Sequence, residues 1–443
     1  MKRILTIAGS DSGGGAGIQA DLKTITLLGG FGMSVLTALT AQNTLGVTAI
    51  HAVPPAFIGQ QLDAVLSDIG ADAVKIGMLY DAAAIEMVAD RLLTYGIEKV
   101  VVDPVMLAKG GDVLLVEQAR ETLARRLIPM AFVVTPNIPE AEVLSKRSIS
   151  TEKDVHEAAR VIHAMGARHV LIKGGHLKGP AKDFLYDGKA FFEFSKDRIH
   201  TPHTHGTGCV YSAAIATYLA MALEVKVAVE KAKAFIHTAI RFALPLGQGH
   251  GPTNLFAQFA REQEKYRVLE ALKTSLTRLM QVPIGHLVPE VQSNLGYALP
   301  FAETHADVAA FPGRLVRIGE NIEAVSGPAF GASQHIASII LTAMRHDPGF
   351  RSAMNIRFSE AHIQQCQALG WKVCSFDRAH EPKATKEVEG SSLEWGTEKV
   401  LSQEATVPDM IFDRGDVGKE PMIRVLGRNP DEVVDKVLRL QKP

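Results

Sequence analysis

Cysteine is scarce in this chain of 443 residues, where only Cys209, Cys366 and Cys374 occur. Three cysteines cannot form a disulfide framework, and such scarcity is typical of proteins in a reducing compartment. A candidate membrane span is lacking as well, because the most apolar long stretch, residues 211–223, is shorter than the roughly 20 residues that cross a bilayer. The apolar run at the amino terminus ends at Ala8, which is too short for a signal peptide. These absences predict a cytoplasmic protein without a membrane partner.

An excess of charge of either sign is also absent. The chain has 47 lysine and arginine residues against 48 aspartate and glutamate residues, a formal net charge of −1. This balance gives no electrostatic reason to expect nucleic acid or an anionic membrane as a partner. Hydrophobic residues make up 47% of the chain, which is ample for globular cores, and its length exceeds that of a usual single domain. We therefore expect two globular domains and no nucleic-acid partner.

Glycine marks the two most informative segments. Residues 9–17 read Gly-Ser-Asp-Ser-Gly-Gly-Gly-Ala-Gly and follow a short apolar run with strand character. Ile18, Leu22 and Ile25 come next at helical spacing. A glycine-rich turn between a strand and a helix is typical of a ligand-binding loop. The loop is not a P-loop, because Gly-Lys-Ser/Thr is missing, and it has no dinucleotide-binding fingerprint in the right register.

The second glycine-rich segment, residues 203–209, ends in Gly206-Thr207-Gly208-Cys209 and runs into an apolar stretch that predicts a helix. Its glycines allow a tight turn, and the amide groups at the start of a helix favour a phosphate or a developing oxyanion. A thiol in this position is expected to have a lowered pKa, which makes Cys209 a candidate thiolate. The alternative is that Cys209 is a small buried apolar side chain, the commonest role of a free cysteine.

Strand-like and helix-like segments alternate through the first domain. The strand candidates are residues 5–8, 34–39, 73–76, 99–102, 132–135 and 169–172, and the helix candidates include residues 55–67, 82–95, 119–127 and 151–165. This alternation predicts a largely parallel sheet flanked by helices, with ligands at the carboxyl ends of the strands. Asp103, Asn137 and Lys173 each follow a strand candidate, so they are candidates for one site.

The composition changes after the glycine-rich residues 247–252. Residues 256–280 are charged but keep Leu269, Leu272 and Leu276 roughly on one face, which predicts a connecting helix. A partner-binding coiled coil is disfavoured, because the heptad pattern is short and irregular. Residues 282–443 are long enough for a separate α/β domain. The polar segment 380–399 lacks an apolar period, so we expect a surface insertion or a loop there.

Seven blocks in the first 255 residues together resemble one family, and they follow its order. They are residues 8–23, 37–44, 75–79, 103–106, 135–141, 173–176 and 205–209. The family is the hydroxymethylpyrimidine and phosphomethylpyrimidine kinase of thiamine biosynthesis, a member of the ribokinase superfamily. Cysteine at position 209, where many sugar kinases have aspartate, points to the branch that acts on pyrimidine and pyridoxal-type substrates. The resemblance implies a three-layer αβα kinase domain over residues 1–255.

The resemblance also implies which residues perform phosphoryl transfer. Gly206, Thr207 and Gly208 would bind the transferring phosphoryl group, and Cys209 would take the proton of the substrate hydroxymethyl group or act by position alone. The residues implied to bind ATP are Asn137, Lys173 and Thr207, and those implied to hold Mg²⁺ are Asp103 and Glu140. As isolated residues they have other interpretations: a turn before Pro104 for Asp103, a helix start for Glu140 and a solvated surface for Lys173.

The pyrimidine pocket is implied in the same way. Its residues are Gln42, Gly9, Asp21, Met78 and Val105. An amide such as that of Gln42 suits a ring with amino and nitrogen functions, because it both donates and accepts hydrogen bonds. Met78 alone would be interpreted as a core residue, since methionine commonly fills gaps in cores.

The second half of the chain resembles a different enzyme family. The residues that carry this resemblance are blocks 311–314, 327–335, 355–357 and 413–423, and the family is the thiamine-phosphate synthase domain found mostly in archaea behind this kinase. Residues 327–334 form a Gly/Pro/Ser loop before a predicted helix, which favours anion binding. The resemblance implies that Arg314 and His335 grip the leaving pyrophosphate. The loop with Asp413, Asp416 and Lys419 is either a site for Mg²⁺-pyrophosphate or a tight glycine turn.

Together the two resemblances imply a bifunctional enzyme. Residues 1–255 would phosphorylate 4-amino-5-hydroxymethyl-2-methylpyrimidine and then its monophosphate with ATP and Mg²⁺, residues 256–278 would connect, and residues 279–443 would couple the diphosphate to 4-methyl-5-(2-phosphoethyl)thiazole. The products would be thiamine phosphate and pyrophosphate. Two alternatives stay open: a second domain that only senses thiamine phosphates, and a kinase that prefers pyridoxal. The resemblance further implies a homodimer or a higher homo-oligomer.

Overall fold

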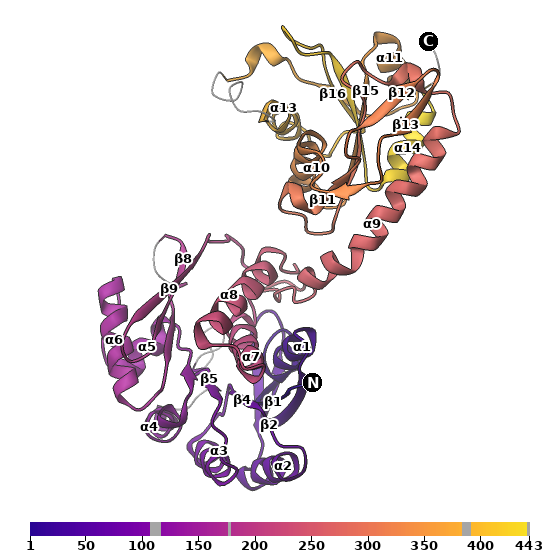
Figure 1. Cartoon of the computed structure of the whole chain (residues 1–443). Coiled ribbons are helices and arrows are strands. Elements are labelled where there is room, and N and C mark those ends of the chain that lie inside the picture. The colour runs from indigo at the N-terminus through magenta and orange to yellow at the C-terminus, as the bar shows by residue number, and fades with distance from the viewer. Residues whose placement is uncertain (107–116, 176–178, 383–390, 441–443) are drawn as a thin grey trace. The chain divides into compact units, whose positions relative to one another are not determined.

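The computed structural model describes residues 1–106, 117–175, 179–382 and 391–440. The chain forms two compact units, Met1–Gln258 and Phe259–Pro443, each with its own sheet and helices (Figure 1). None of the helices in these described ranges combines the length and the apolarity that crossing a membrane requires.

The first unit is built on a nine-stranded sheet with the order β3-β2-β1-β4-β5-β6-β7-β8-β9. Its six parallel strands are β1 (Arg3–Asp11), β2 (Phe31–Gln42), β4 (Ala73–Ile76), β5 (Val100–Val102), β6 (Val133–Val134) and β7 (Val170–Lys173). The antiparallel edge strands are β3 (Val47–Ala52), β8 (Ala181–Tyr186) and β9 (Phe191–Lys196). The expected largely parallel sheet is thus confirmed, and the three edge strands are additions that the sequence pattern did not predict.

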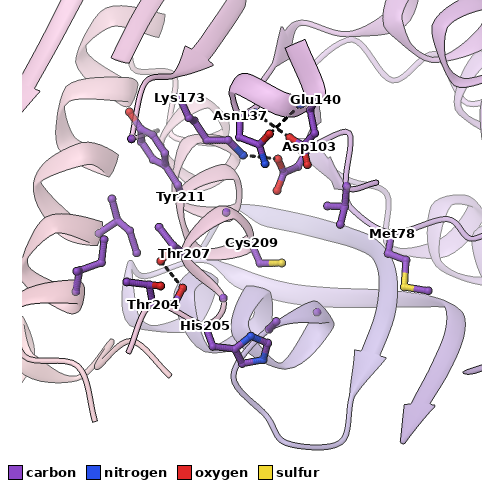
Figure 2. Close-up of a pocket in the computed structure, with 18 of the residues that line it drawn as sticks. Met78, Asp103, Asn137, Glu140, Lys173, Thr204, His205, Thr207, Cys209 and Tyr211 are labelled. Atoms are coloured by element: carbon purple, nitrogen blue, oxygen red, sulfur yellow. Dashed lines mark hydrogen bonds and ion pairs between the residues drawn. The ribbon is translucent and has the colours of Figure 1, made fainter. Parts of the chain in front are cut away.

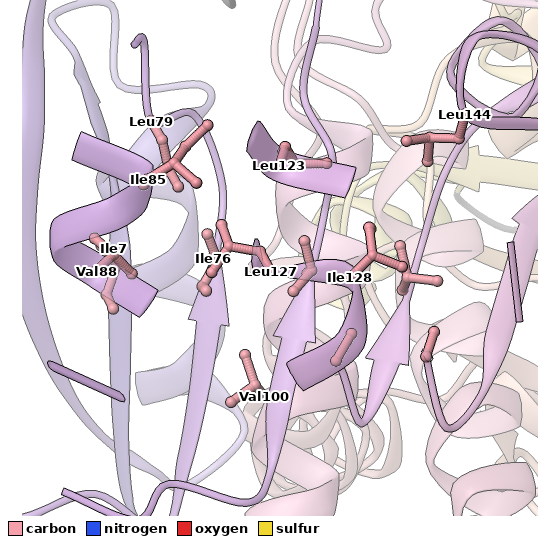
Figure 3. Packing of buried hydrophobic residues seen from close by; sticks show 14 of the residues in the cluster. Ile7, Ile76, Leu79, Ile85, Val88, Val100, Leu123, Leu127, Ile128 and Leu144 are labelled. Carbon is pink, nitrogen blue, oxygen red and sulfur yellow. The ribbon is translucent and has the colours of Figure 1, made fainter. Parts of the chain in front are cut away.

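Helices cover both faces of this sheet. They are α1 (Gly17–Leu27), α2 (Pro55–Asp68), α3 (Ala82–Thr94), α4 (Glu117–Arg126), α5 (Ile138–Ser145), α6 (Glu152–Ala164), α7 (Thr207–Ala220) and α8 (Val225–Arg241). Strand β5 shows why there are three layers. Val100 and Val102 pack in the core with α2 to α6, and Figure 3 shows Val100 in this core. Val101 packs in the other core, with α1, α7 and α8. A strand that is apolar on both faces requires cover on both, which gives the αβα arrangement.

The second unit has a seven-stranded sheet with the order β14-β11-β10-β15-β18-β17-β16. The strands are β10 (Leu295–Ala298), β11 (Val308–Ala310), β14 (Ala329–Phe330), β15 (Ser352–Arg357), β16 (Val373–Ser375), β17 (Met410–Asp413) and β18 (Met422–Gly427), and a separate hairpin joins β12 (Leu315–Ile318) to β13 (Asn321–Ala324). All neighbouring pairs are antiparallel except β16 and β17.

Helices also cover both faces of the second sheet. They are α9 (Ala257–Met280), α10 (Gln334–His346), α11 (Glu360–Ala368), α13 (Ser391–Leu401) and α14 (Pro430–Leu438). The helix expected as a connector is α9, but Val268, Leu272 and Leu279 are fully buried in the core that also contains residues of α11 and α14. Most of α9 therefore belongs to the second unit, because its apolar face is covered there.

The prediction of a loop over residues 380–399 is wrong for the second part of this segment. Residues 391–401 form α13, in which Val400 and Leu401 pack in the core with α10. Trp395 packs edge-on against Phe376. The helix was missed because few of its apolar residues recur at helical spacing, so tertiary packing rather than local pattern defines it.

Candidate active site

A cavity of about 790 Å³ lies at the carboxyl ends of the parallel strands of the first unit. Its walls come from β1, β2, β4, β7 and β8, from the segments after β4, β5 and β6, and from α8 and the start of α7. Among the residues expected to form a site, the cavity is lined by Gly9, Gln42, Met78, Asp103, Val105, Asn137, Glu140, Lys173, Gly206, Thr207, Gly208 and Cys209. Figure 2 shows Lys173, Asn137, Glu140 and Asp103 in one group, with Cys209 facing the same space.

The turn before α7 has the backbone of an anion-binding site. Gly206 caps the helix in the left-handed region at φ +82°, and a Cβ there would lie 1.8 Å from the carbonyl oxygen of Gly15. A glycine cap has no side chain to occupy the first amides of the helix, so these N–H groups face the cavity. The hydroxyl of Thr207 donates to the carbonyl of Thr204 at 2.7 Å, and the backbone N–H of Thr207 donates to the same carbonyl at 3.3 Å.

Asp103 and Lys173 form the charged centre of the cavity. The ammonium of Lys173 lies 2.8 Å from Oδ1 of Asp103, and that oxygen also accepts a hydrogen bond from Thr135 at 3.1 Å. Burial lowers the pKa of Lys173, but the carboxylates of Asp103 and Glu140 outweigh it and raise the pKa above its ordinary value. Lys173 is therefore a cation at neutral pH, held where it can neutralise phosphate oxygens.

Asn137 and Glu140 start α5 with a reciprocal capping box. The Asn137 side chain accepts the N–H of Glu140 at 2.9 Å, and the Glu140 carboxylate accepts the N–H of Asn137 at 2.8 Å. Burial and then Asp103 raise the pKa of Glu140 to about 7, against the opposing effect of Lys173. A protein cage is absent, since no group of three metal-ligating side chains occurs among the described residues. The carboxylates of Asp103 and Glu140 nevertheless fit Mg²⁺, which is often held by one or two carboxylates, water and substrate phosphates.

The expectation of a lowered pKa for Cys209 is wrong. Burial raises the pKa of this thiol to about 11, and Asp21 and Asp103 add to the effect, while Lys75 opposes it. The helix start does not compensate, because burial together with the Asp21 and Asp103 carboxylates outweighs the effects that lower the pKa. Cys209 therefore keeps its proton at neutral pH, so a thiolate base is not supported.

Asp21 does not line the cavity, in contrast to the other expected pocket residues. Its side chain is completely buried, where Oδ2 accepts hydrogen bonds from Lys75 at 2.8 Å and Thr6 at 2.6 Å. The residue that lines the cavity is its partner Lys75. Asp21 acts on the cavity indirectly, by holding the ammonium of Lys75 in place.

Several further lining residues were missed from the sequence. Lys75 lies within the apolar strand segment Ala-Val-Lys-Ile, and such a lysine is a usable signal of a buried functional cation. Lys233 of α8 lies 2.6 Å from Asp183, and both line the cavity near Tyr211. Arg120 of α4 also lines it, and its Nε has no hydrogen-bond partner in the described ranges. The sequence offers no signal for these last residues, because they come together only through folding.

In the second unit, three of the expected blocks meet on one short segment. Arg314 has a φ of +70°, and its guanidinium donates to the carbonyl of Val291. Glu420 accepts the N–H groups of Glu290 at 3.1 Å and Val291 at 3.2 Å. Asn355 donates to the carbonyl of Gln292 at 3.0 Å. The blocks 311–314, 355–357 and 413–423 are therefore tied together through residues 290–292.

Two expected residues of this unit have different environments. His335 is the second residue of α10 and is exposed. Asp413 is completely buried, with Arg378 at 2.6 Å and Arg424 at 2.6 Å on its two oxygens. Asp416 and Lys419 exchange backbone hydrogen bonds of 3.0 and 2.8 Å. The loop is thus a tight glycine turn, and Asp413 is not available to Mg²⁺-pyrophosphate.

A three-layer αβα unit with an open glycine turn facing a buried lysine and carboxylate defines a small-molecule kinase of the ribokinase type. Comparison with known families agrees. Residues 11–254 match the model of the phosphomethylpyrimidine kinase family, and the chain belongs to this family. Residues 271–439 match the model of thiamine-phosphate synthase ThiN.

Similar proteins support both the family and the fold. A thiamine biosynthesis bifunctional protein ThiED from Geobacter sulfurreducens is 59% identical over 252 residues, which cover 57% of this chain but only 51% of that protein. A hydroxymethylpyrimidine/phosphomethylpyrimidine kinase from Bacillus subtilis is 49% identical over 257 residues, 58% of this chain and 95% of that protein. The chain thus spans about half the length of the first relative and nearly all of the second.

Two solved structures resemble the kinase fold. A pyridoxal kinase from Bacillus subtilis in complex with ADP has a TM-score of 0.56 at 42% identity, covering 58% of this chain and 99% of that one. A pyridoxal kinase from Staphylococcus aureus in complex with AMP-PCP and pyridoxal has a TM-score of 0.55 at 37% identity, covering 58% of this chain and 94% of that one.

Proposed function

We propose that the first unit transfers the γ-phosphoryl group of ATP to 4-amino-5-hydroxymethyl-2-methylpyrimidine, and a second one to the resulting monophosphate. The observation that carries this proposal is the single cavity that joins the glycine turn and Lys173 to the Gln42 pocket. It is supported by membership of the phosphomethylpyrimidine kinase family and by the nucleotides named for the similar pyridoxal kinases.

The described residues divide the chemistry between positioning and charge neutralisation. The amides at the start of α7 receive the transferring phosphoryl oxygens, and Lys173 supplies a positive charge beside them. Mg²⁺, held by Asp103 and Glu140, would neutralise further phosphate charge. A loose transition state retains the acceptor proton until late, so a strong base is not required and the protonated thiol of Cys209 serves by position.

We further propose that the second unit couples the pyrimidine diphosphate to 4-methyl-5-(2-phosphoethyl)thiazole, which gives thiamine phosphate and pyrophosphate. The match of residues 271–439 to the ThiN family supports this assignment. The φ of +70° at Arg314 adds to it, because strained backbone of this kind clusters at functional sites. Arg314 and His335 are the residues proposed to hold the leaving pyrophosphate.

The test is formation of thiamine phosphate by the full chain supplied with Mg-ATP, the hydroxymethylpyrimidine and the thiazole phosphate. Arg314→Ala is expected to abolish this product while the pyrimidine diphosphate still accumulates. The matched control is Arg317→Ala, three residues along, whose guanidinium bonds the carbonyl of Gly319 at 2.9 Å. If the unaltered chain accumulates the diphosphate and forms no thiamine phosphate, the second unit is a sensor and the coupling proposal is refuted.

A second candidate activity is phosphorylation of pyridoxal, favoured by the pyridoxal kinases that the fold resembles. Comparison of kcat/KM for pyridoxal and for the hydroxymethylpyrimidine decides which is the main substrate, and we expect the pyrimidine to be preferred.

A cytoplasmic location and a homodimer also remain proposals, which cell fractionation and analytical ultracentrifugation test.

A further inference from the structure

Asp11 and His205 join the two glycine-rich loops inside the cavity. Asp11 is the last residue of β1, and its carboxylate accepts the N–H groups of Gly13 at 2.8 Å, Gly15 at 3.1 Å and Ala16 at 2.8 Å. Its Oδ2 also lies 2.8 Å from Nε2 of His205, the residue before the Gly206 turn. Both side chains are largely buried, at 3% and 12% exposure, so the contact is shielded from water.

The contact determines which nitrogen of His205 carries a proton. Burial acts to raise the pKa of Asp11, but His205 and the amides of Ala16 and Gly13 together lower it below the ordinary value. Asp11 is therefore an ionised carboxylate, which only accepts hydrogen bonds. The nitrogen 2.8 Å from it must donate, so Nε2 of His205 bears hydrogen.

This protonation sets the orientation of the Gln42 amide. One terminal atom of that amide, placed as Nε2, lies 3.4 Å from Nε2 of His205, and the other, placed as Oε1, lies 3.0 Å from Oγ1 of Thr40. A protonated His205 nitrogen cannot accept from an N–H group. The amide oxygen therefore belongs on the His205 side, an exchange of atoms that leaves the side-chain shape unchanged.

The remaining hydrogen bonds agree with the exchanged amide. Oγ1 of Thr40 lies 2.9 Å from the carbonyl oxygen of Ser10, which can only accept, so the hydroxyl proton goes there. The free lone pairs of Thr40 then accept from the Gln42 amide nitrogen. A directed chain results, in which the single Nε2–H of His205 donates to Asp11, the Gln42 amide oxygen lies 3.4 Å from that hydrogen-bearing nitrogen, Gln42 donates to Thr40, and Thr40 donates to Ser10.

We propose that the Asp11–His205 pair, through this chain, makes Gln42 select an aminopyrimidine over pyridoxal. The inference rests on the proposed kinase function. Beside its hydroxymethyl group, the aminopyrimidine has an amino donor followed by a ring-nitrogen acceptor. Pyridoxal has an aldehyde acceptor followed by a hydroxyl donor, which is the reverse order. A Gln42 amide held in one orientation complements the order of donor and acceptor in only one of the two substrates. An amide that is free to turn complements both.

The experiment compares kcat/KM for the hydroxymethylpyrimidine and for pyridoxal in the full chain. His205→Phe keeps a ring but removes the hydrogen-bond donor. We expect kcat/KM for the pyrimidine divided by kcat/KM for pyridoxal to fall at least tenfold, because a buried polar group without a matching partner weakens binding by about this factor. His205→Gln restores an N–H donor and should recover part of the ratio. The matched control is His203→Phe. His203 accepts the N–H of Gly251 at 3.0 Å and takes no part in the series of hydrogen bonds from Asp11 to Ser10.

A ratio that stays within threefold of the unaltered enzyme in His205→Phe, while both activities fall together, overturns the proposal. It would show that the pair only holds the loops. Binding of 4-amino-2,5-dimethylpyrimidine, which has no hydroxyl to phosphorylate, provides a readout that is independent of turnover. Calorimetry should show weaker binding in His205→Phe and not in His203→Phe, and equal binding in the two overturns the proposal even if the kinase activity itself is absent.

The state of His205 can also be read directly. The nitrogen shifts of ¹⁵N-labelled histidine distinguish a protonated from an unprotonated Nε2, and we expect the protonated form in the unaltered chain at neutral pH. An unprotonated Nε2 contradicts the directed chain. If the protein phosphorylates neither substrate, the proposed kinase function is refuted. The nitrogen spectrum and the binding data then still decide whether the Asp11–His205 pair orients Gln42.

Discussion

The ammonium nitrogen of Lys75 lies 2.8 Å from Oδ2 of Asp21, and both side chains are completely buried. Burial acts to lower the pKa of Lys75, but Asp21 and the neighbouring acidic groups raise it, so Lys75 stays charged. The pair places a fixed cation at the cavity wall, and Lys75 opposes the rise that burial gives the pKa of Cys209, whereas Asp21 adds to that rise. The cavity thus has a buried lysine at its wall in addition to Lys173 and Lys233.

We expect Lys75→Met to destabilise the first unit by about 3–5 kcal/mol, because it leaves the Asp21 carboxylate buried without its partner. Urea denaturation followed in the full chain measures the change. The double variant Lys75→Met with Asp21→Leu should recover much of the loss, since no isolated charge remains. A single variant that loses less than about 1 kcal/mol contradicts the view that the pair is tightly coupled.

Gly206→Ala is expected to lower kinase kcat/KM at least about a hundredfold, equivalent to about 2.7 kcal/mol. A Cβ at this position would lie 1.8 Å from the carbonyl oxygen of Gly15, so the two glycine-rich loops must move apart. The matched control is Gly96→Ala. Gly96 also has a positive φ, at +62°, but nothing lies within 4 Å of the added Cβ. Equal loss of activity in both variants would mean that backbone strain alone, and not loop contact, is responsible.

Cys209 should react slowly with iodoacetamide near neutral pH, because its pKa of about 11 leaves the thiol protonated. The rate, measured by mass spectrometry of the peptide that contains Cys209, should rise steadily between pH 7 and pH 10. A rate that is already level above pH 7 would indicate a thiolate and would restore Cys209 as a candidate base.

Glu140 should make the stability of the first unit depend on pH when Mg²⁺ is absent. Its pKa in the folded protein is about 7, above the ordinary value of 4.5, so the folded state binds the proton more tightly than the unfolded state. The free energy of unfolding should therefore fall as pH rises from about 4.5 to 7. Glu140→Gln should flatten this dependence and increase stability at pH 8 by about 3 kcal/mol. Denaturation curves at several pH values, with EDTA present, test this, and an unchanged slope in the variant contradicts it.

Asp413→Asn should destabilise the second unit by about 3–5 kcal/mol, because Arg378 and Arg424 would lose the carboxylate that both contact at 2.6 Å. Asp416→Asn in the adjacent turn is the control, and we expect little change there. Thermal unfolding of the full chain, with the transition of the second unit resolved, distinguishes the two. If Asp413→Asn leaves that transition in place, the buried pairs are not essential to the fold.

The sequence pattern predicted the elements of the first unit well where local and tertiary preferences agree. The strand candidate at residues 73–76 is β4 within the same limits, and the helix candidate at residues 55–67 is α2 but for one residue. Elements whose pattern is weak were missed. Strand β9 lies at the sheet edge and has partly buried and exposed residues without regular alternation, and α13 depends on packing against α10.

The candidate site shows the same division. The motifs at Asp103, Asn137 and Lys173 are contiguous signals at strand ends, the motif at Gly206 precedes a helix, and all of them line one cavity. The roles of Asp21 and Cys209 could not be predicted, because each depends on burial and on charges brought from elsewhere in the chain. The burial of Asp413 could not be predicted for the same reason, because the two arginines that contact its carboxylate are 35 and 11 residues away in the sequence.

The sequence by itself determined that the protein has two α/β units, that the first has glycine-rich turns of the kind that suit phosphate, and which family each half resembles. These features reside in short contiguous segments, whose spacing and backbone requirements are visible without the fold. Only the tertiary structure decided the electrostatics: that Lys75 is held by Asp21, that Cys209 keeps its proton, and that Asp11 fixes the proton of His205 beside Gln42. Such properties depend on distance and on the exclusion of water, which are set when distant segments pack together.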